Sequence, residues 1–145
     1  MAEKENIELA KLQIAALNSR DLESYVSRFD ESYVGHSETA PGPIQGRAGV
    51  RQNVENIFKA FPDLRLEVEQ IIASGDSVVV RFVARGTHKG NFAGIAPTNK
   101  SIVLHACNVT DVSNGKVIRS RLYADNATLF QQIGVFSLPK ATAAS

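Results

Sequence analysis

A tight turn near the C-terminal end constrains the fold of this chain more than any other short segment. The turn, Ser113-Asn114-Gly115, lies between two apolar-rich segments, 103–112 and 116–124. The dipeptide Asn-Gly favours the left-handed backbone that joins two antiparallel strands, so these segments predict a β-hairpin. After the second segment, apolar residues recur at helical spacing until Gly134, which predicts a short helix that ends there.

The apolar pattern of the preceding chain predicts three helices and three further strands. Helical spacing covers 4–17, 21–29 and 47–61, whereas alternation or short apolar runs cover 32–36, 64–69 and 78–86. A long loop rich in Gly, Pro and Asn, 87–100, precedes the hairpin.

This order of elements predicts an α+β fold. We expect a curved antiparallel sheet of about four long strands plus a short one. Three helices from the N-terminal half would cover the sheet, and a short C-terminal helix would follow it. Sheet and helices would form a cone with an internal pocket.

Length and composition limit the partners that we expect. The 145 residues carry a net charge of +1 and a single cysteine, Cys107. A balanced charge gives no basic surface for nucleic acid, and a lone cysteine fits a reducing compartment. No apolar run reaches the ~20 residues that span a bilayer, and the charged N-terminus does not resemble a signal peptide. We expect a cytoplasmic protein with one domain over 1–138, a disordered tail over 139–145, and no nucleic-acid or membrane partner.

Three sequence blocks carry a resemblance to a known family. They read FPDLRLEVEQIIASGDSVVVRFVARGTH, GNFAGIAPTNKSI and NGKVIRSRLYADNATLFQQIG. In this order they resemble the SnoaL-like polyketide cyclase family, of the nuclear-transport-factor-2-like, or cystatin-like, α+β cone superfamily. The resemblance implies a cofactor-free enzyme that uses acid/base catalysis on a hydrophobic, carbonyl-bearing small molecule. The implied reaction is an intramolecular aldol closure or related enolate chemistry.

The resemblance also implies catalytic residues. Asp125 matches the family's general acid/base aspartate, His105 matches a histidine on the preceding strand, and His36 matches a histidine near the pocket mouth. A carboxyl group in an apolar pocket has a raised pKa, so Asp125 could remove a proton beside a carbonyl and later protonate the alkoxide. Asp125 also directly precedes a helical run, so it could instead cap that helix.

The hairpin register decides whether His105 and Asp125 share a face of the sheet, because a one-residue shift reverses every side chain. A two-residue turn, Asn114-Gly115, places Asp125 opposite Leu104, and His105 then points to the other face. A three-residue turn instead places His105 opposite Tyr123, on the face of Asp125. The catalytic hypothesis requires the second register.

The face that carries Asp125 is predicted to line the pocket. On it, Tyr123 would donate a hydrogen bond to a substrate carbonyl, and Cys107 would be a small apolar contact rather than a nucleophile. Phe58 lies on the apolar stripe of the third helix and would also face the pocket. The predicted substrate-binding residues are Tyr123, His36, Phe58 and Cys107.

The opposite face of the hairpin is predicted to pack against another copy of the chain, because it is too apolar to face water. It carries Ile102, Leu104, Ala106, Ile118, Leu122 and Ala124. We therefore expect a homo-oligomer, a dimer or a tetramer, joined through the sheet's outer face.

Two other functions remain open. Epoxide hydrolases on this cone use an Asp–Arg–Asp set, part of which Arg85 or Arg121 could supply together with Asp125. Alternatively, the chain is a small-molecule binding module without chemistry. The three histidines lack metal-site spacing and no nucleotide-binding motif is present, so we expect neither a metal nor a cofactor.

Overall fold

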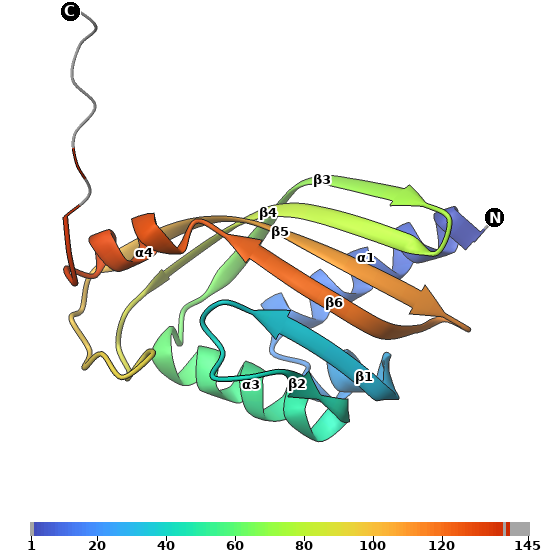
Figure 1. Cartoon of the computed structure of the whole chain (residues 1–145), viewed down its shortest axis with the longest axis horizontal. Coiled ribbons are helices and arrows are strands. Elements are labelled where there is room, and N and C mark those ends of the chain that lie inside the picture. Colours follow the sequence, from blue (N-terminus) through green and yellow to red (C-terminus); the bar gives the residue numbers. More distant parts are fainter. Residues whose placement is uncertain (1, 138, 140–145) are drawn as a thin grey trace, which may run out of the picture.

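Six strands and four helices make up the part of the chain that the computed structural model describes, residues 2–137 and residue 139 (Figure 1). In chain order they are α1 (Ala2–Ser19), α2 (Leu22–Ser27), β1 (Phe29–Ser37), β2 (Ile44–Gln45), α3 (Gly46–Ala60), β3 (Arg65–Ser74), β4 (Ser77–Thr87), β5 (Ser101–Ser113), β6 (Lys116–Ala124) and α4 (Asn126–Gln132). Apart from residue 139, the predicted tail lies outside the described residues. Within the described ranges, no helix is long and apolar enough to cross a membrane.

The strands form one curved sheet in the order β2-β1-β6-β5-β4-β3. Neighbouring strands are antiparallel except β1 and β6, which run parallel. α1 packs mainly against β3 and β4, and α3 packs against β1; in Figure 1, α1 runs behind the strands and α3 lies below β1. The predicted α+β fold is confirmed, with one strand more than expected, since no pattern indicated the two-residue β2.

The second helix is shorter than its apolar spacing predicts. α2 ends at Ser27, and Phe29, expected in the helix, instead opens β1 opposite Val117 of β6. The Phe29 ring meets the Tyr33 ring edge-on, with centroids 4.7 Å apart, and lies 5.1 Å from the Tyr25 ring. This aromatic cluster holds β1 in place, because its rings pack together with apolar residues of α3.

The hairpin has a two-residue turn followed by a bulge. Asn114 and Gly115 have φ values of 51° and 72°, the left-handed values of a type I′ turn. Ser113 pairs with Lys116, but the register shifts by one residue between this pair and the rest of the hairpin. Ile118 is the extra residue in β6, so every later residue of this strand faces the side opposite to the one that unbroken alternation from the turn would give.

The bulge brings His105 and Asp125 opposite each other. The Asp125 backbone N–H donates to the His105 carbonyl oxygen at 3.1 Å, and Cys107 pairs with Tyr123. His105 and Asp125 therefore share a face, as the catalytic hypothesis required. The observed register is nevertheless neither of the two that we considered, because both assumed a hairpin without a bulge.

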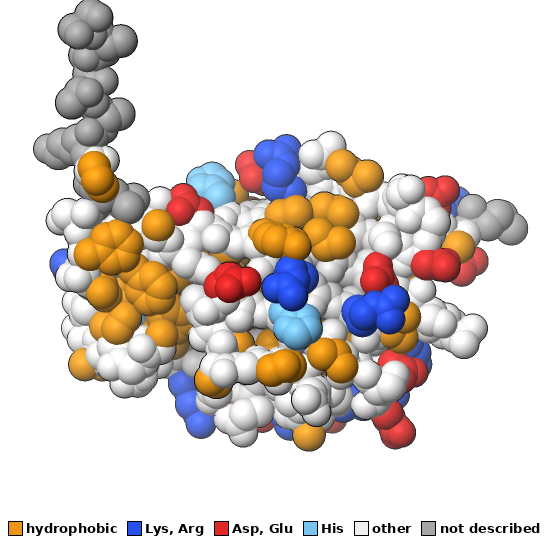
Figure 2. Space-filling view, in the orientation of Figure 1, with side chains coloured by type: hydrophobic (Ala, Val, Ile, Leu, Met, Phe, Trp, Pro, Cys, Tyr) orange, Lys and Arg blue, Asp and Glu red, His pale blue; other side chains and the backbone are white. Residues whose placement is uncertain are grey.

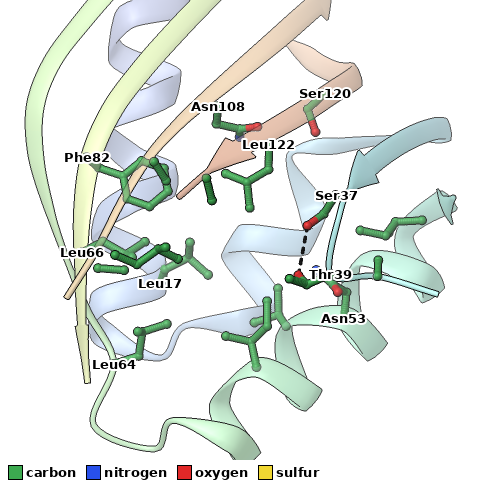
Figure 3. Close-up of a pocket in the computed structure, with 18 of the residues that line it drawn as sticks. Leu17, Ser37, Thr39, Asn53, Leu64, Leu66, Phe82, Asn108, Ser120 and Leu122 are labelled. Atoms are coloured by element: carbon green, nitrogen blue, oxygen red, sulfur yellow. Dashed lines mark hydrogen bonds between the residues drawn. The ribbon is translucent and has the colours of Figure 1, made fainter. Parts of the chain in front are cut away.

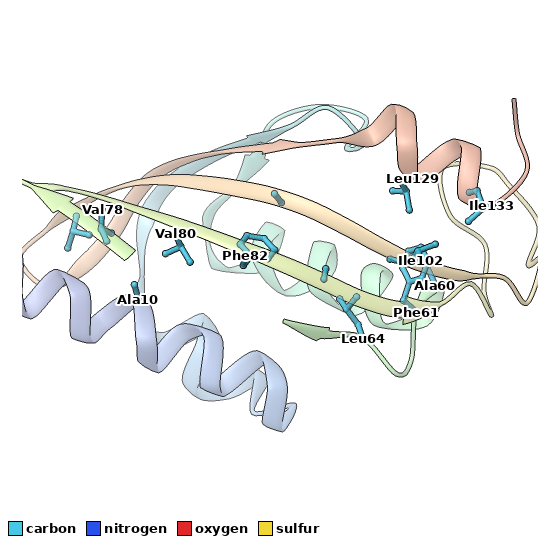
Figure 4. Close-up of a cluster of buried hydrophobic side chains, with 13 residues drawn as sticks. Ala10, Ala60, Phe61, Leu64, Val78, Val80, Phe82, Ile102, Leu129 and Ile133 are labelled. Atoms are coloured by element: carbon cyan, nitrogen blue, oxygen red, sulfur yellow. The ribbon is translucent and has the colours of Figure 1, made fainter. Parts of the chain in front are cut away.

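The main apolar core lies between the sheet and α1 and continues to α4 (Figure 4). Val78, Val80 and Phe82 of β4 contribute to it. At the other end, Leu129 of α4 and Ile133 directly after it are each 2% exposed. Burial of one such side chain contributes about 2 kcal/mol, so these two residues hold α4 against the end of the sheet.

Asn18, near the end of α1, binds the edge strand β3 with both atoms of its amide group. Its Nδ2 donates to the Leu66 carbonyl oxygen at 2.9 Å, and its Oδ1 accepts from the Leu66 N–H at 2.8 Å. The amide thus takes the place of a neighbouring strand at this edge, where backbone groups would otherwise be unpaired. It fixes the register of α1 against the sheet.

Replacing Asn18 by alanine is expected to lower the free energy of unfolding by about 1–3 kcal/mol, because both Leu66 backbone groups lose their partner. Urea unfolding of Asn18→Ala beside the unmodified chain measures this loss. Asn56→Ala is the matched control, since Asn56 is exposed and accepts a hydrogen bond from Gln52 one turn away. We expect the control to change by less than about 0.5 kcal/mol; equal losses would contradict the role of Asn18.

Candidate functional site

A cavity of about 720 Å³ lies between the sheet, α1 and α3. Its wall on β5 and β6 is formed by Ile102, Leu104, Ala106, Asn108, Thr110, Ser120, Leu122 and Ala124. The predicted internal pocket is therefore present. Its wall, however, is the hairpin face that we expected to pack against another subunit, so that face prediction is wrong.

The four hairpin residues predicted to line the pocket lie on the outer face of the sheet instead. These four residues are His105, Cys107, Tyr123 and Asp125. Together with Glu69 and Arg81 they border a shallow depression on that face. Tyr123 is 56% exposed. The prediction that these side chains face the cavity is wrong, because the helices cover the apolar face of the hairpin and leave this one open.

Charge explains which face is buried. The outer face carries four arginines, each in an ion pair with a carboxylate of the same surface: Arg81 with Glu69, Arg85 with Glu67, Arg119 with Asp111 and Arg121 with Glu38. Figure 2 shows this face, where blue and red side chains surround a small orange group. Burying guanidinium groups in an apolar cavity would cost far more than burying the leucines and alanines of the other face.

Asp125 caps α4 rather than facing the cavity. Its Oδ1 accepts a hydrogen bond from the Thr128 backbone N–H at 3.2 Å. Hydrogen bonding to the side chain and backbone of Thr128 lowers the pKa of the Asp125 carboxyl group, and nearby His105 lowers it further. A carboxylate that acts as a general base near neutral pH needs a raised pKa. The geometry therefore matches the capping alternative.

The cavity has an apolar side and a polar side (Figure 3). Leu17, Leu64, Leu66 and Phe82 line the first. Across from them lie the polar side chains Ser37, Thr39, Asn53, Asn108 and Ser120. Such a lining suits a ligand that is apolar over most of its surface and carries a few polar atoms at one side.

Few of the polar groups are paired with each other. The hydroxyl groups of Tyr33 and Ser120 share a hydrogen bond, and the Ser37 and Thr39 hydroxyl groups lie 3.2 Å apart. Asn108 makes no side-chain hydrogen bond to any described residue and faces the cavity. These groups are therefore available to a ligand.

Sequence reasoning missed this polar side, although a signal for it was present. Asn108 and Thr110 continue the alternation of Leu104 and Ala106 along β5. Had the apolar face been assigned to the cavity, this period of two would have placed both polar residues inside it. Ser120 follows in the same way from its position on β6, two residues before Leu122.

The ionisable side chains that border the cavity are those of Tyr25, Tyr33, His36 and Lys59. Burial raises the pKa of both tyrosines, so their hydroxyl groups stay protonated. His36 is exposed and pairs with Arg121 in the sheet, and it also borders the cavity, so it lies at the cavity rim; its substrate-binding role stays a prediction. The described lining holds no carboxylate, and no His, Cys, Asp or Glu cluster within the described ranges could hold a metal ion.

Phe58 of α3 lies in the cavity wall, where the Arg20 guanidinium covers its ring at 4.0 Å from the centroid. Its substrate-binding role stays a prediction. Near α4, the loop 88–100 closes one end of the cavity with residues 91–93. The loop docks on α3 through the Gly90 N–H, which donates to the Ala60 carbonyl oxygen at 3.1 Å.

The sequence from residue 7 to residue 133 matches the family described as SnoaL-like polyketide cyclase. A comparison with curated proteins finds no significant match.

Solved structures provide further likenesses. AclR from Streptomyces galilaeus, described as a candidate hydroxylase, is 29% identical with a TM-score of 0.82, and the match covers 93% of this chain and 99% of AclR. IdmH from Streptomyces antibioticus, described as a candidate polyketide cyclase, is 29% identical with a TM-score of 0.76, covering 88% and 96%. A protein from Catenulispora acidiphila with a ketosteroid isomerase-like fold is 12% identical with a TM-score of 0.76, covering 88% and 92%; this likeness shows the fold alone.

Replacing Asp125 by alanine is expected to lower the thermal unfolding midpoint, because α4 loses its cap. The folded-state pKa is lowered, so the charged cap stabilises the fold above the unfolded-state pKa, and this contribution is lost as the pH falls through the folded-state pKa. The difference between variant and unmodified chain should therefore be largest above about pH 5 and shrink below about pH 4. Calorimetry across this range measures it.

Asp76→Ala is the control for this prediction, since Asp76 lies exposed in the turn between β3 and β4. We expect its effect on the unfolding midpoint to be small at every pH. A pH-independent effect of Asp125→Ala would contradict the charged cap.

Proposed function

Because the chain belongs to the SnoaL-like polyketide cyclase family, we propose that it carries out cyclase-type enolate chemistry on a hydrophobic small molecule that bears carbonyl groups. The observation that supports this most directly is the cavity of about 720 Å³ with one apolar and one polar side. Its volume lies within the range of about 300–1,000 Å³ that small-molecule sites occupy. An apolar ring system with oxygen atoms along one edge would match both sides at once.

The proposed reaction is an intramolecular aldol closure. A proton leaves the carbon beside one carbonyl, the resulting enolate carbon bonds to a second carbonyl carbon, and the new alkoxide oxygen takes up a proton. No proton and no electron is gained or lost overall, so the reaction needs no cofactor. Folding the substrate inside the cavity brings its two reacting carbons together, which by itself lowers the barrier.

The described lining supports a different source of catalysis from the one that we expected for Asp125 and His105. It contains neutral hydrogen-bond donors but no carboxylate. Neutral donors in a buried site stabilise an enolate oxygen as charge develops on it. The other ionisable groups on the cavity border are His36 and Lys59, so we assign the proton transfers to the cavity rim, where His36 and solvent can reach a bound substrate. The catalytic role of Asp125 and His105 stays a prediction without a contact to the cavity.

The two alternatives are affected unequally by the geometry. An epoxide hydrolase would need arginine and carboxylate groups inside the cavity, whereas Arg85 and Arg121 are paired with Glu67 and Glu38 on the outer face. A binding module without chemistry fits the carboxylate-free lining and remains the second candidate. Measured conversion of a bound substrate would distinguish a cyclase from this binding module.

Two further expectations stay predictions. A cytoplasmic location is consistent with the lone cysteine, Cys107. A homo-oligomer could form through the outer face of the sheet, but not through the row of residues first named for it, because all of them except Ile118 line the cavity.

The function is tested by filling the cavity. Ala106 is 6% exposed and lines the cavity, so Ala106→Phe would occupy space that the substrate needs and is expected to lower turnover by roughly tenfold or more, because the substrate could no longer take its reactive position. Cys107→Phe is the matched control, since Cys107 is the next residue but faces outward. A panel of linear β-polyketones with mass-spectrometric detection of the cyclised product measures turnover.

The variant Asp125→Asn completes this experiment. Retained turnover in Asp125→Asn with loss in Ala106→Phe would support catalysis by the cavity. Loss in Asp125→Asn alone would instead restore Asp125 as the base. If panel members bind to the unmodified chain but none is converted, the binding-module alternative is correct.

A further inference from the structure

The hydroxyl groups of Tyr33 and Ser120 meet in the cavity wall, although their residues are 87 positions apart. Tyr33 belongs to β1 and Ser120 to β6, and the parallel pairing of these strands sets Ser120 beside Gly35. Tyr33 is only 5% exposed, and its ring packs edge-on against Phe29. The pair is therefore held inside the wall by burial of the tyrosine ring and its packing against Phe29.

Gly35 makes the room that the Tyr33 hydroxyl occupies. A Cβ at position 35 would lie 2.0 Å from the Tyr33 Oη and 2.6 Å from its Cζ. Nonbonded atoms do not approach this closely, so the phenol can fold along β1 toward Ser120 because residue 35 has no side chain. Gly35 is thus a positioning residue for the pair.

The pair contains two hydroxyl protons and one hydrogen bond. One proton lies between the two oxygens, and the other has no acceptor among the described residues. Both residues line the cavity, and the Ser120 hydroxyl group can rotate about its bond to carbon. The second O–H can therefore point into the cavity, where leaving a buried donor without an acceptor is unfavourable.

Two neighbours extend this group of donors. Thr110 pairs with Ser120 across β5 and β6, and Asn108 lies two residues along β5 on the same face. Figure 3 shows Asn108 and Ser120 at one end of the cavity. Neither Thr110 nor Asn108 makes a side-chain hydrogen bond to a described residue. Donors from three strands therefore face one part of the cavity.

This group is uncharged. A carboxylate or phosphate of a ligand would need a cationic partner when it loses its water, and the group has none. A ketone oxygen needs only neutral donors. We propose that the Tyr33–Ser120 pair, supported by Asn108, binds a ketone oxygen of the ligand, and that Gly35 positions this pair. The inference rests on the proposed function and names the end of the substrate that this part of the cavity receives.

Two probes of nearly equal shape test the site. Naphthyl ethyl ketone carries a carbonyl group, and propylnaphthalene has CH2 in its place. Calorimetric titration measures the binding of both probes in the same way. We expect the double variant Tyr33→Phe/Ser120→Ala to bind the ketone roughly five- to tenfold more weakly, the effect of losing about one neutral hydrogen bond, and to bind propylnaphthalene as before.

Two controls separate the site from general packing. Tyr25→Phe removes a cavity-lining hydroxyl outside the pair, and we expect it to leave the preference for the ketone unchanged. The infrared carbonyl stretch of isotope-labelled ketone should lie at lower frequency when bound to the unmodified chain than when bound to the double variant. Gly35→Ala should shift this stretch in the same direction as the double variant.

The outcomes distinguish this site from the proposed function. Equal weakening for both probes in the double variant, or an unchanged carbonyl stretch, would overturn the ketone site while leaving the cavity as a binding site. If the unmodified chain binds neither probe, both the proposed function and the ketone site are contradicted.

Discussion

The structure depends on the burial of one apolar face of a curved sheet. Every strand presents alternate side chains to α1 and α3 or to the open side, and the choice between the two faces is made by the cost of burying charge. Arg81 and Arg119 could not enter an apolar interior, so their neighbours at the alternate positions do. Once this choice is made, the position of the cavity and the identity of its wall follow.

The fold could be predicted from the sequence because it follows from the periodic spacing of apolar residues. The helical spacing in 4–17 and 47–61 and the Asn114-Gly115 turn each specify one local conformation, and neighbouring elements agree with one another. The boundary between α2 and β1 could not be predicted in this way. Phe29 fits a helical stripe as well as a strand. Its contact with Tyr33 and its pairing with Val117 favour the strand, but they form only when β1 joins the sheet.

The candidate site was harder to predict from the sequence, because its residues depend on which face of the hairpin lines the cavity. Two observations indicated that face: Arg119 and Arg121 share the parity of Tyr123, and the opposite row is almost wholly apolar. The resemblance of Asp125 to a family aspartate outweighed them. The Tyr33–Ser120 contact could not be foreseen at all, since it joins strands that are distant in sequence and parallel in space.

The bulge at Ile118 keeps the apolar row of β6 in the cavity wall. Had the register of Ser113 and Lys116 continued along the hairpin without a bulge, Tyr123 would lie opposite Ala106 and face the cavity in place of Leu122. Deletion of Ile118, by contrast, would remove the bulge and leave every later cross-strand pair of β6 as it is. The strand can therefore gain or lose one residue at the bulge while the same side chains face the cavity, so variation in strand length need not alter the chemistry of the site.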